Sequence, residues 1–438
     1  MTLRIRRILF YCFIVLFLVL SGAIVAYAQG WRLDLETLDM KKVGAIYVRS
    51  FPPKAKIYLN DRPVKNESWF FQNGTLLDNL FPKHYRVKLV LDGYHTWHQT
   101  VEVIPSFVSE VKYAVLISKT PEKVLAGPLS NFFRINNELV TQDNEGALTW
   151  RGRKLPGDTV VGATDDAKRL LTKDSKTRRY FWNNLEDYTK VEVFSVLKKL
   201  KVAANPKTDS FFIDKTDSQK LLFLTPTRLS LLEVARSRLT SLENGAPLAH
   251  VAASRFWFAW TIFDPATERT TLVLYDKFLR EKRVKAALLP RETSRLLFTK
   301  DGSLAVLQST GDFYIYDIED DHLRPVASDV RDFFLNAEGT EVALLEHGGL
   351  EVISFRDQED YWRIAVPDVA SIQKLSWYRD SFHLFLYRND AIQILDLGDT
   401  RFEHLATLAE TPLADYDPEL NILYFLSGGN LFALPFAR

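Results

Sequence analysis

The sequence predicts an all-β protein with an N-terminal transmembrane helix, a small β-sandwich-type domain and a β-propeller of seven or eight blades. Three observations lead to this prediction. Residues 8–28 form an uncharged apolar run, and short alternating runs fill residues 43–120. Strand-and-turn patterns then recur through residues 121–438 at intervals of about 40 residues, which is the period of propeller blades. Residues 1–7 are a basic tail, and residues 29–42 read as a linker next to the membrane.

The apolar run is long enough to span a bilayer. Ile8 to Ala28 carries no charge and would give about 31 Å of helix, which matches the hydrocarbon thickness. Arg4, Arg6 and Arg7 precede it, and cationic flanks stay in the cytoplasm. We therefore expect a single-pass protein of the cell membrane with a cytoplasmic N-terminus and extracytoplasmic C-terminal domains.

A cleaved signal peptide is the alternative for this segment. Ala26-Tyr27-Ala28 places small residues at the spacing that a signal peptidase prefers. The apolar run is longer than the roughly 7 to 15 residues usual for a signal peptide, which favours an uncleaved anchor. Cys12 lies inside the run without the context of a lipidation site, so we expect it to be a small apolar residue.

The amino-acid composition gives information on the partners and on the stabilising groups that this protein can have. The 438 residues include 56 basic and 55 acidic side chains, so the formal charge of +1 gives no reason to expect nucleic acid as a partner. Apolar residues make up 47% and charged residues 25%, as in folded globular proteins. Because Cys12 is the only cysteine, an intrachain disulfide and a cysteine-rich zinc site are both excluded.

Residues 43–120 show the alternation of short β-strands. The runs are Gly44–Ser50, Ala55–Leu59, Tyr85–Leu91 and Thr100–Ile104, and the turns between them contain Pro52-Pro53, Asn60-Asp61 and Asp92-Gly93. Each run keeps one face apolar, which predicts a compact sheet domain of about 75 residues.

The order of these residues resembles the PEGA domain. The corresponding segments are Ser50-Phe51-Pro52-Pro53-Lys54-Ala55, Ile57–Val64, Leu80–Val87 and Asp92-Gly93-Tyr94. Lys54 and Lys83 stand where the family usually has turn glycines. The resemblance implies a non-catalytic extracytoplasmic binding or spacer module of the bacterial or archaeal envelope, with no catalytic residue to transfer.

The repeat in residues 121–438 is clearest near the C-terminus. The strands Asp312–Asp317, Leu350–Phe355, Ala391–Asp396 and Asn430–Leu434 each follow a turn. Weaker copies cover Phe132–Trp150, Val160–Trp182, Val202–Leu224 and Val251–Tyr275. This region resembles the divergent bacterial WD40-like propellers, although the Gly-His and Trp-Asp dipeptides of that family are absent. Two β-sandwiches are the alternative, but they give no reason for a period near 40 residues.

The sequence contains no Walker loop, no nucleophile elbow and no His-Glu-x-x-His motif. His95 and His98 would face opposite sides of a strand, and the acidic run Asp317–His322 lacks the glycine turn of a calcium loop. We therefore predict that the protein is not an enzyme and has no cofactor, no catalytic residue and no metal site.

The candidate ligand-binding residues are Trp69, Trp257 and Trp260, because large aromatic side chains favour interfaces. Core packing in strands is their alternative role. We expect a binding or scaffold protein of the cell envelope whose propeller recognises an envelope protein, a peptide or a polysaccharide. The alternative is an exported propeller enzyme acting on glycans or peptides. An aromatic patch on one propeller face would favour a protein partner, and a channel-mouth cluster of arginine with acidic residues would favour an enzyme.

Overall fold

The computed structural model describes residues 3–35, 37–66, 74–289, 291–300, 302–354, 361–364, 366–397 and 405–436. The chain divides into two compact units. The first contains Met1–Pro121 with the short segments Arg401–Leu405 and Leu434–Arg438, and the second contains Glu122–Thr400 and Ala406–Ala433. Each unit is described below by itself.

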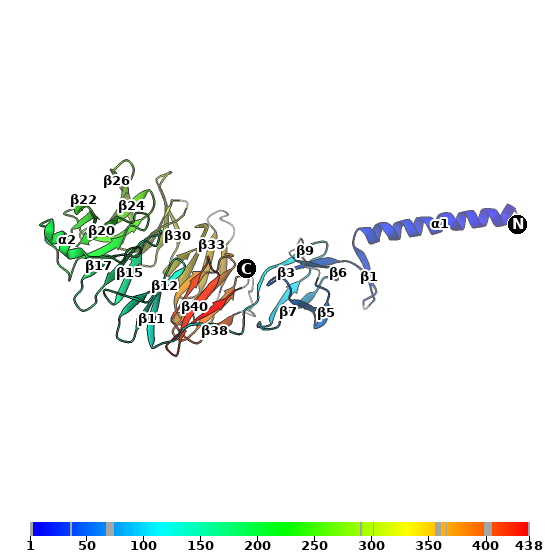
Figure 1. Cartoon of the computed structure of the whole chain (residues 1–438). Coiled ribbons are helices and arrows are strands. Elements are labelled where there is room, and N and C mark those ends of the chain that lie inside the picture. The colour runs from blue at the N-terminus through cyan, green and yellow to red at the C-terminus, as the bar shows by residue number, and fades with distance from the viewer. Residues whose placement is uncertain are drawn as a thin grey trace. The chain divides into compact units, whose positions relative to one another are not determined.

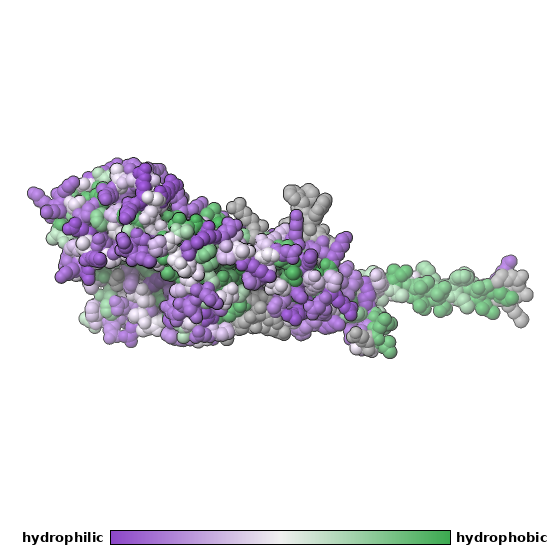
Figure 2. Space-filling model, turned by 60° about the horizontal axis from the view of Figure 1, so that its bottom comes forward, coloured by the Kyte–Doolittle hydropathy of each residue, from purple (hydrophilic) through white to green (hydrophobic). Residues whose placement is uncertain are grey.

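The first unit begins with helix α1 (Leu3–Ala28; Figure 1), which carries no charged side chain from Ile8 onward and is hydrophobic along the face seen in Figure 2. Among the described residues it is the one helix long and apolar enough to cross a membrane, over Ile5–Ala28. The helix starts before the apolar run because Arg4, Arg6 and Arg7, which are good helix formers, continue it. The predicted N-terminal apolar helix is confirmed, and such a helix suits an anchor or a signal sequence equally.

The predicted linker contains a β-hairpin. Strands β1 (Trp31–Asp34) and β2 (Asp39–Lys42) pair in an antiparallel register with Trp31 opposite Lys42. Gly30 takes a left-handed conformation with φ of 85° between the helix and the first strand. The hairpin is therefore connected to α1 by a tight turn instead of an extended segment.

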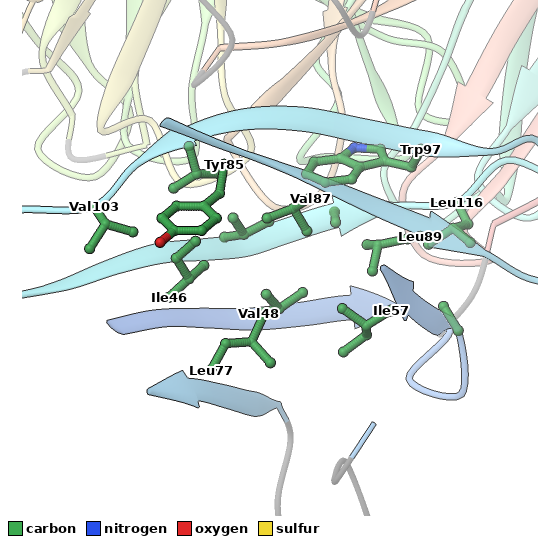
Figure 3. Close-up of a cluster of buried hydrophobic side chains, with 14 residues drawn as sticks. Ile46, Val48, Ile57, Leu77, Tyr85, Val87, Leu89, Trp97, Val103 and Leu116 are labelled. Carbon is green, nitrogen blue, oxygen red and sulfur yellow. The ribbon is translucent and has the colours of Figure 1, made fainter. Parts of the chain in front are cut away.

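Two sheets form the rest of the first unit. Strands β3 (Gly44–Phe51), β6 (Thr75–Leu80) and β9 (Val108–Val115) make one sheet, in which β3 pairs in parallel with β9. Strands β4 (Lys56–Leu59), β5 (Arg62–Val64), β7 (His84–Val90) and β8 (Trp97–Glu102) make the other. The alternating residues of these strands enclose one apolar core (Figure 3), as in a β-sandwich.

Backbone conformation and close packing explain several of the residue types found in this unit. Asn60 and Asp61 have φ of 49° and 63° and join β4 to β5, as expected for a tight hairpin turn. Neither Lys54 nor Lys83 has a positive φ, so these lysines are accommodated in ordinary backbone conformations. Gly44 is required for another reason: a Cβ added there would lie within 2.4 Å of the Ile104 carbonyl oxygen.

The second unit contains eight four-stranded antiparallel sheets within the described residues, and these are the blades of a propeller. Blade 1 comprises β11 (Leu129–Ile135), β12 (Glu138–Asp143), β13 (Leu148–Trp150) and β14 (Arg153–Leu155). Blade 2 comprises β15 (Thr159–Ala163), β16 (Arg169–Lys173), β17 (Tyr180–Asn184) and β18 (Lys190–Glu192). Blade 3 comprises β19 (Ser210–Ile213), β20 (Lys220–Thr225), β21 (Arg228–Glu233) and β22 (Arg238–Asn244). Blade 4 comprises β23 (Leu248–Ala253), β24 (Trp257–Asp264), β25 (Arg269–Asp276) and β26 (Glu281–Leu289).

The remaining blades follow the same order. Blade 5 comprises β27 (Thr293–Phe298), β28 (Leu304–Gln308), β29 (Phe313–Asp317) and β30 (His322–Ala327). Blade 6 comprises β31 (Val330–Leu335), β32 (Glu341–Glu346), β33 (Leu350–Ser354) and β34 (Tyr361–Ile364). Blade 7 comprises β35 (Ile372–Trp377), β36 (His383–Arg388), β37 (Ile392–Asp396) and β38 (Ala406–Ala409). A short helix α2 (Val193–Lys199) connects blades 2 and 3, and the 3-10 turn η1 (Val369–Ser371) precedes β35.

Blade 8 combines both ends of the propeller sequence. Its strands β39 (Ala414–Asp417), β40 (Ile422–Ser427) and β41 (Asn430–Pro435) come from the C-terminus, whereas its outer strand β10 (Glu122–Leu125) comes from the start. Phe132 of blade 1 packs with Tyr424 and Leu426 of blade 8, and Figure 1 shows β11 and β40 as neighbours. The ring is therefore closed, which removes free sheet edges between the first and last blades.

Packing between blades explains the apolar inner strands. Every residue of β28 and of β36 is buried, because the neighbouring blades cover both faces of the sheet. One core joins Ala305 and Phe313 of blade 5 to Phe333 and Leu344 of blade 6. The prediction of an all-β fold with a propeller is confirmed, and the number of blades within the described residues is eight.

Candidate functional site

Three turns from two neighbouring blades lie at one end of the second unit. In blade 3, the turn Asp214–Gln219 connects β19 to β20. In blade 4, Ser254–Phe256 connects β23 to β24, and Lys277–Arg280 connects β25 to β26. Because the strands of a blade are antiparallel, its first and third turns emerge on the same face of the propeller. These turns border a pocket with a volume of about 330 Å³.

We call this pocket the blade 3–4 groove. Its lining contains five cationic side chains and three acidic ones, together with polar, aliphatic and aromatic groups. The lining residues are Asp214, Thr216, Asp217, Lys220, Leu231, Glu233, Arg238, Thr240, Arg255, Phe258, Tyr275, Lys277, Phe278 and Arg280. The excess of cationic over acidic side chains suits a ligand with negative charge.

Lys277 holds the bottom of the groove together. Its Nζ lies 2.8 Å from each carboxylate oxygen of Asp214, and it donates to the Ser254 carbonyl oxygen at 2.6 Å. The same atom lies 4.2 Å from the centre of the Phe258 ring. Burial lowers the pKa of Lys277, although the neighbouring Asp214 carboxylate acts in the opposite direction.

The outer part of the groove is built from rigid turns. The Asp276 carboxylate accepts hydrogen bonds from the backbone N–H groups of Phe278 at 2.8 Å and of Leu279 at 2.9 Å. The Lys277 N–H donates to the Phe256 carbonyl oxygen at 2.9 Å, which joins the two turns of blade 4. These bonds hold the Phe278 side chain outward, and it is 84% exposed.

An apolar and cationic patch results on these turns. Phe256 and Leu279 are 52% and 59% exposed beside Phe278. The three guanidinium groups of Arg238, Arg255 and Arg280 are exposed, and none is within 4.0 Å of a carboxylate in the part of the chain that the structure describes. Aromatic and arginine side chains dominate the binding energy of protein interfaces. We call Arg255, Phe256, Phe278, Leu279 and Arg280 the blade 4 patch.

The acidic residues of the groove are satisfied by the protein itself. Lys220 pairs with Asp217 at 2.6 Å, and Arg236 approaches Glu233 at 3.4 Å. Burial raises the pKa of Asp217, but the hydrogen bonds from Lys220 and from the Gln219 backbone outweigh burial and lower it overall. Within the described residues, the charged side chains of the groove that have no ion-pair partner are therefore Arg238, Arg255 and Arg280.

The tryptophans predicted from the sequence lie elsewhere. Trp260 is fully buried between blades 3 and 4, and its Nε1–H donates to Glu243 at 3.2 Å. Trp257 lies three residues earlier on β24, is partly exposed and has the Arg283 guanidinium 5.2 Å from its ring centre. Trp69 lies outside the described residues. Neither Trp257 nor Trp260 lines the groove, and the role of the three tryptophans in ligand binding stays a prediction.

The blade 4 patch was not predicted from the sequence. The available signal was Phe278-Leu279 in a short turn between two alternating strands, where polar residues are usual.

The other segments noted from the sequence have local roles. The Asp317 carboxylate accepts from the Glu319 and Asp320 N–H groups at 2.9 and 3.1 Å, as in a turn. Within the described residues, no group of three or more His, Cys, Asp and Glu side chains is arranged to hold a metal ion.

Comparison with known proteins assigns no family to this chain. No protein-family model matches the chain, and no curated protein matches it. An oligogalacturonate lyase from Vibrio parahaemolyticus is 11% identical, with a TM-score of 0.46 over 72% of this chain and 98% of the other. Another oligogalacturonate lyase, in complex with manganese, is 10% identical, with a TM-score of 0.45 and the same shares. Hsv2p from Kluyveromyces lactis is 12% identical, with a TM-score of 0.42 over 64% of this chain and 98% of its own.

One prediction is corrected by these comparisons. The missing catalytic motifs led to the prediction that the protein is not an enzyme, whereas two of the similar structures are lyases. Linear motifs detect groups that are close in sequence, but a propeller brings together residues from different blades, as with Asp214 and Lys277. At these identities the likeness transfers neither a substrate nor a reaction. The chain is a β-propeller protein with an N-terminal apolar helix.

Proposed function

We propose that this chain is a membrane-anchored protein of the cell envelope that binds a partner protein through the blade 4 patch. In this proposal residues 1–7 lie in the cytoplasm, residues 8–28 span the membrane and residues 29–42 follow at its outer surface. Residues 43–120 form a PEGA-like module, and residues 121–438 form the propeller outside the cytoplasm. The apolar helix α1 and the arginines before it support this topology.

The blade 4 patch is the observation that carries the proposed binding. Phe278 is held almost fully exposed by a hydrogen-bonded turn, so that little conformational entropy is lost when a partner covers it. The guanidinium groups of Arg255 and Arg280 flank it and have no carboxylate partner among the described residues. A surface of this kind suits a protein segment that combines apolar and acidic side chains.

The proposal is tested by site-specific crosslinking in the native membrane. A photoreactive phenylalanine analogue replaces Phe278 in the full chain, and the control places it at Leu413, which is exposed in the connection between blades 7 and 8. We expect a protein adduct from position 278 and none from position 413. The Arg280→Glu variant should abolish the adduct, whereas Arg269→Glu, at the opposite end of β25, should leave it unchanged.

The alternative predicted from the sequence is an exported propeller enzyme, and it is tested in parallel. The purified full chain is incubated with polygalacturonate and with unfolded peptide, and product formation is followed over time. Turnover of either polymer together with no adduct at position 278 would contradict partner binding as the function and support the enzyme.

A further inference from the structure

The juxtamembrane hairpin exposes its apolar face. In a hairpin, alternate residues share a face, and the register places Leu33 opposite Met40 and Trp31 opposite Lys42. Leu33 and Met40 are 50% and 51% exposed, and Leu35 and Leu38 in the connecting turn are 78% and 74% exposed. We call Trp31, Leu33, Leu35, Leu38, Met40 and Lys42 the hairpin face.

The opposite face of the hairpin is polar and partly buried. Asp34 is buried and its carboxylate accepts from the Lys41 ammonium at 2.7 Å. A hairpin surrounded by water has the reverse arrangement, with its apolar side chains on the protected face. The exposed side chains of this hairpin therefore favour an apolar environment over water.

The hairpin is attached directly to the end of α1. The Gly30 N–H donates to the Tyr27 carbonyl oxygen at 3.1 Å, and Arg32 Nη1 donates to the same oxygen at 2.7 Å. The Val43 N–H donates to the Gly30 carbonyl oxygen at 2.9 Å, which holds both ends of the hairpin at the helix terminus. Strands of four residues extend about 13 Å, so the turn with Leu35 and Leu38 cannot move far from the end of the helix.

The residues at this junction are those found at membrane interfaces. The Arg32 guanidinium lies 3.6 Å from the centre of the Tyr27 ring, and the Lys42 ammonium lies 5.4 Å from that of Trp31. Aromatic and cationic side chains are enriched where a transmembrane helix leaves the hydrocarbon layer, because one end of each is apolar and the other polar. The residues at the base of the hairpin are thus of the types that proteins place in the headgroup layer of a membrane.

A second apolar segment lies beside the same junction. The turn between β8 and β9 carries Ile104 and Phe107, and β9 begins with Val108; each of the three is at least half exposed. The Ser106 N–H donates to the Val43 carbonyl oxygen at 3.0 Å, immediately after the hairpin. Exposed apolar residues therefore occur on both segments that adjoin Val43.

We propose that the hairpin lies in the headgroup region of the outer leaflet, with the hairpin face inserted toward the acyl chains of a phospholipid bilayer. This inference rests on the proposed anchoring by α1 and adds a second contact between the chain and the membrane. Because the hairpin follows directly after α1, the bilayer that α1 is proposed to span is the partner that we infer for the hairpin face. The contact limits the rotation of the first unit about the axis of α1.

The test uses a fluorescent probe in full chains reconstituted into vesicles of phosphatidylcholine and phosphatidylglycerol. The only cysteine of the chain, Cys12, is replaced by alanine, and an environment-sensitive label is attached through Leu35→Cys or, as a matched control, Asp39→Cys on the polar face. Quenching is measured with lipids that carry a spin label near the headgroup or deep in the acyl chain. We expect blue-shifted emission from position 35 and quenching by the shallow spin label at least about twofold stronger than at position 39.

Labelling of the native Cys12 separates the two proposals, because this residue lies within α1. Deep quenching at Cys12 with water-like emission at position 35 would overturn the hairpin inference and leave the anchor intact. Water-like emission at both positions would overturn the anchor and, with it, the hairpin inference. A circular dichroism spectrum unchanged by Leu35→Cys excludes misfolding as the cause.

Discussion

Lys277 and Asp214 form an ion pair that joins two blades of the propeller. The ammonium lies 2.8 Å from both carboxylate oxygens, and the side chains are only 14% and 2% exposed. Asp214 belongs to the first turn of blade 3 and Lys277 to the third turn of blade 4. The pair therefore fixes the base of the groove on which the blade 4 patch is built.

Removing one partner of this pair should destabilise the propeller. We expect Asp214→Ala to lower the free energy of unfolding by about 3–5 kcal/mol, because the Lys277 ammonium would stay buried without its countercharge. The measurement is urea unfolding of the full chain in detergent. Lys168→Ala removes an exposed pair with Glu186 and should have a much smaller effect on the free energy of unfolding, because solvent screens this pair. Equal effects of the two substitutions would contradict the assigned role of the buried pair.

The two tryptophans of β24 should differ in their effect on stability. Trp260 is fully buried, so Trp260→Ala should cost about 3–5 kcal/mol through the cavity that it leaves. Trp257 is partly exposed, and we expect a clearly smaller loss for Trp257→Ala. Thermal unfolding of both variants provides the comparison. A neutral Trp260→Ala variant with impaired partner binding would instead support the ligand role predicted from the sequence.

Gly44 should be intolerant of a side chain. A Cβ at this position would lie 2.4 Å from the Ile104 carbonyl oxygen and 3.0 Å from that of Phe107. We expect Gly44→Ala to destabilise the first unit by about 1–3 kcal/mol, because backbone atoms must shift. Gly348→Ala is the control, since no atom lies within 4 Å of the added Cβ and its φ is not positive. The rate of limited proteolysis within the first unit reports its loss of structure.

His383 should make the propeller less stable at alkaline pH. Burial lowers the pKa of this imidazole, but the hydrogen bond with Asp380 at 2.8 Å and the charge of Asp396 outweigh burial, so the pKa is raised overall. A raised pKa contributes stability that is complete below the unfolded value of about 6.5 and is lost as the pH rises through the folded value. The free energy of unfolding of the propeller should therefore decrease as the pH rises above about 6.5.

The His383→Gln variant identifies the source of this pH dependence. It should be less stable than the wild type at pH 6 and should show a flatter profile at higher pH, as measured by chemical unfolding at several pH values. His347→Gln is the matched control, because His347 approaches Asp329 at 2.7 Å but is 66% exposed. A profile that flattens with His347→Gln and not with His383→Gln would contradict this assignment.

Partner binding at the blade 4 patch should weaken with salt. The charges of Arg255 and Arg280 are exposed, and interactions between exposed charges are screened over about 10 Å at 0.1 M ionic strength. The yield of the crosslink from position 278 should fall between low salt and 0.5 M salt. Arg280→Gln should reduce both the yield at low salt and its salt dependence. A yield that does not respond to salt would indicate purely apolar binding.

Local patterns in the sequence predicted the apolar helix, the strands of the first unit and the blades, but neither the hairpin in residues 29–42 nor helix α2. The uncharged run gives a helix because each backbone group is bonded within the segment, and the alternating runs give strands because one face of each meets a core. The repeat near 40 residues indicated blades, since one blade cannot bury both of its faces alone. Because these properties depend on residues that are close together in the chain, local sequence patterns are enough to predict them.

Which side chains are exposed follows only from the assembled fold. Trp260 and Phe278 are both aromatic residues of blade 4, yet packing of blade 3 buries the first, while the hydrogen bonds of a turn hold the second in solvent. The groove, the pair of Lys277 with Asp214 and the closing of β10 on β41 each join residues far apart in sequence. Burial depends on which distant segments are neighbours, and no local pattern contains that information.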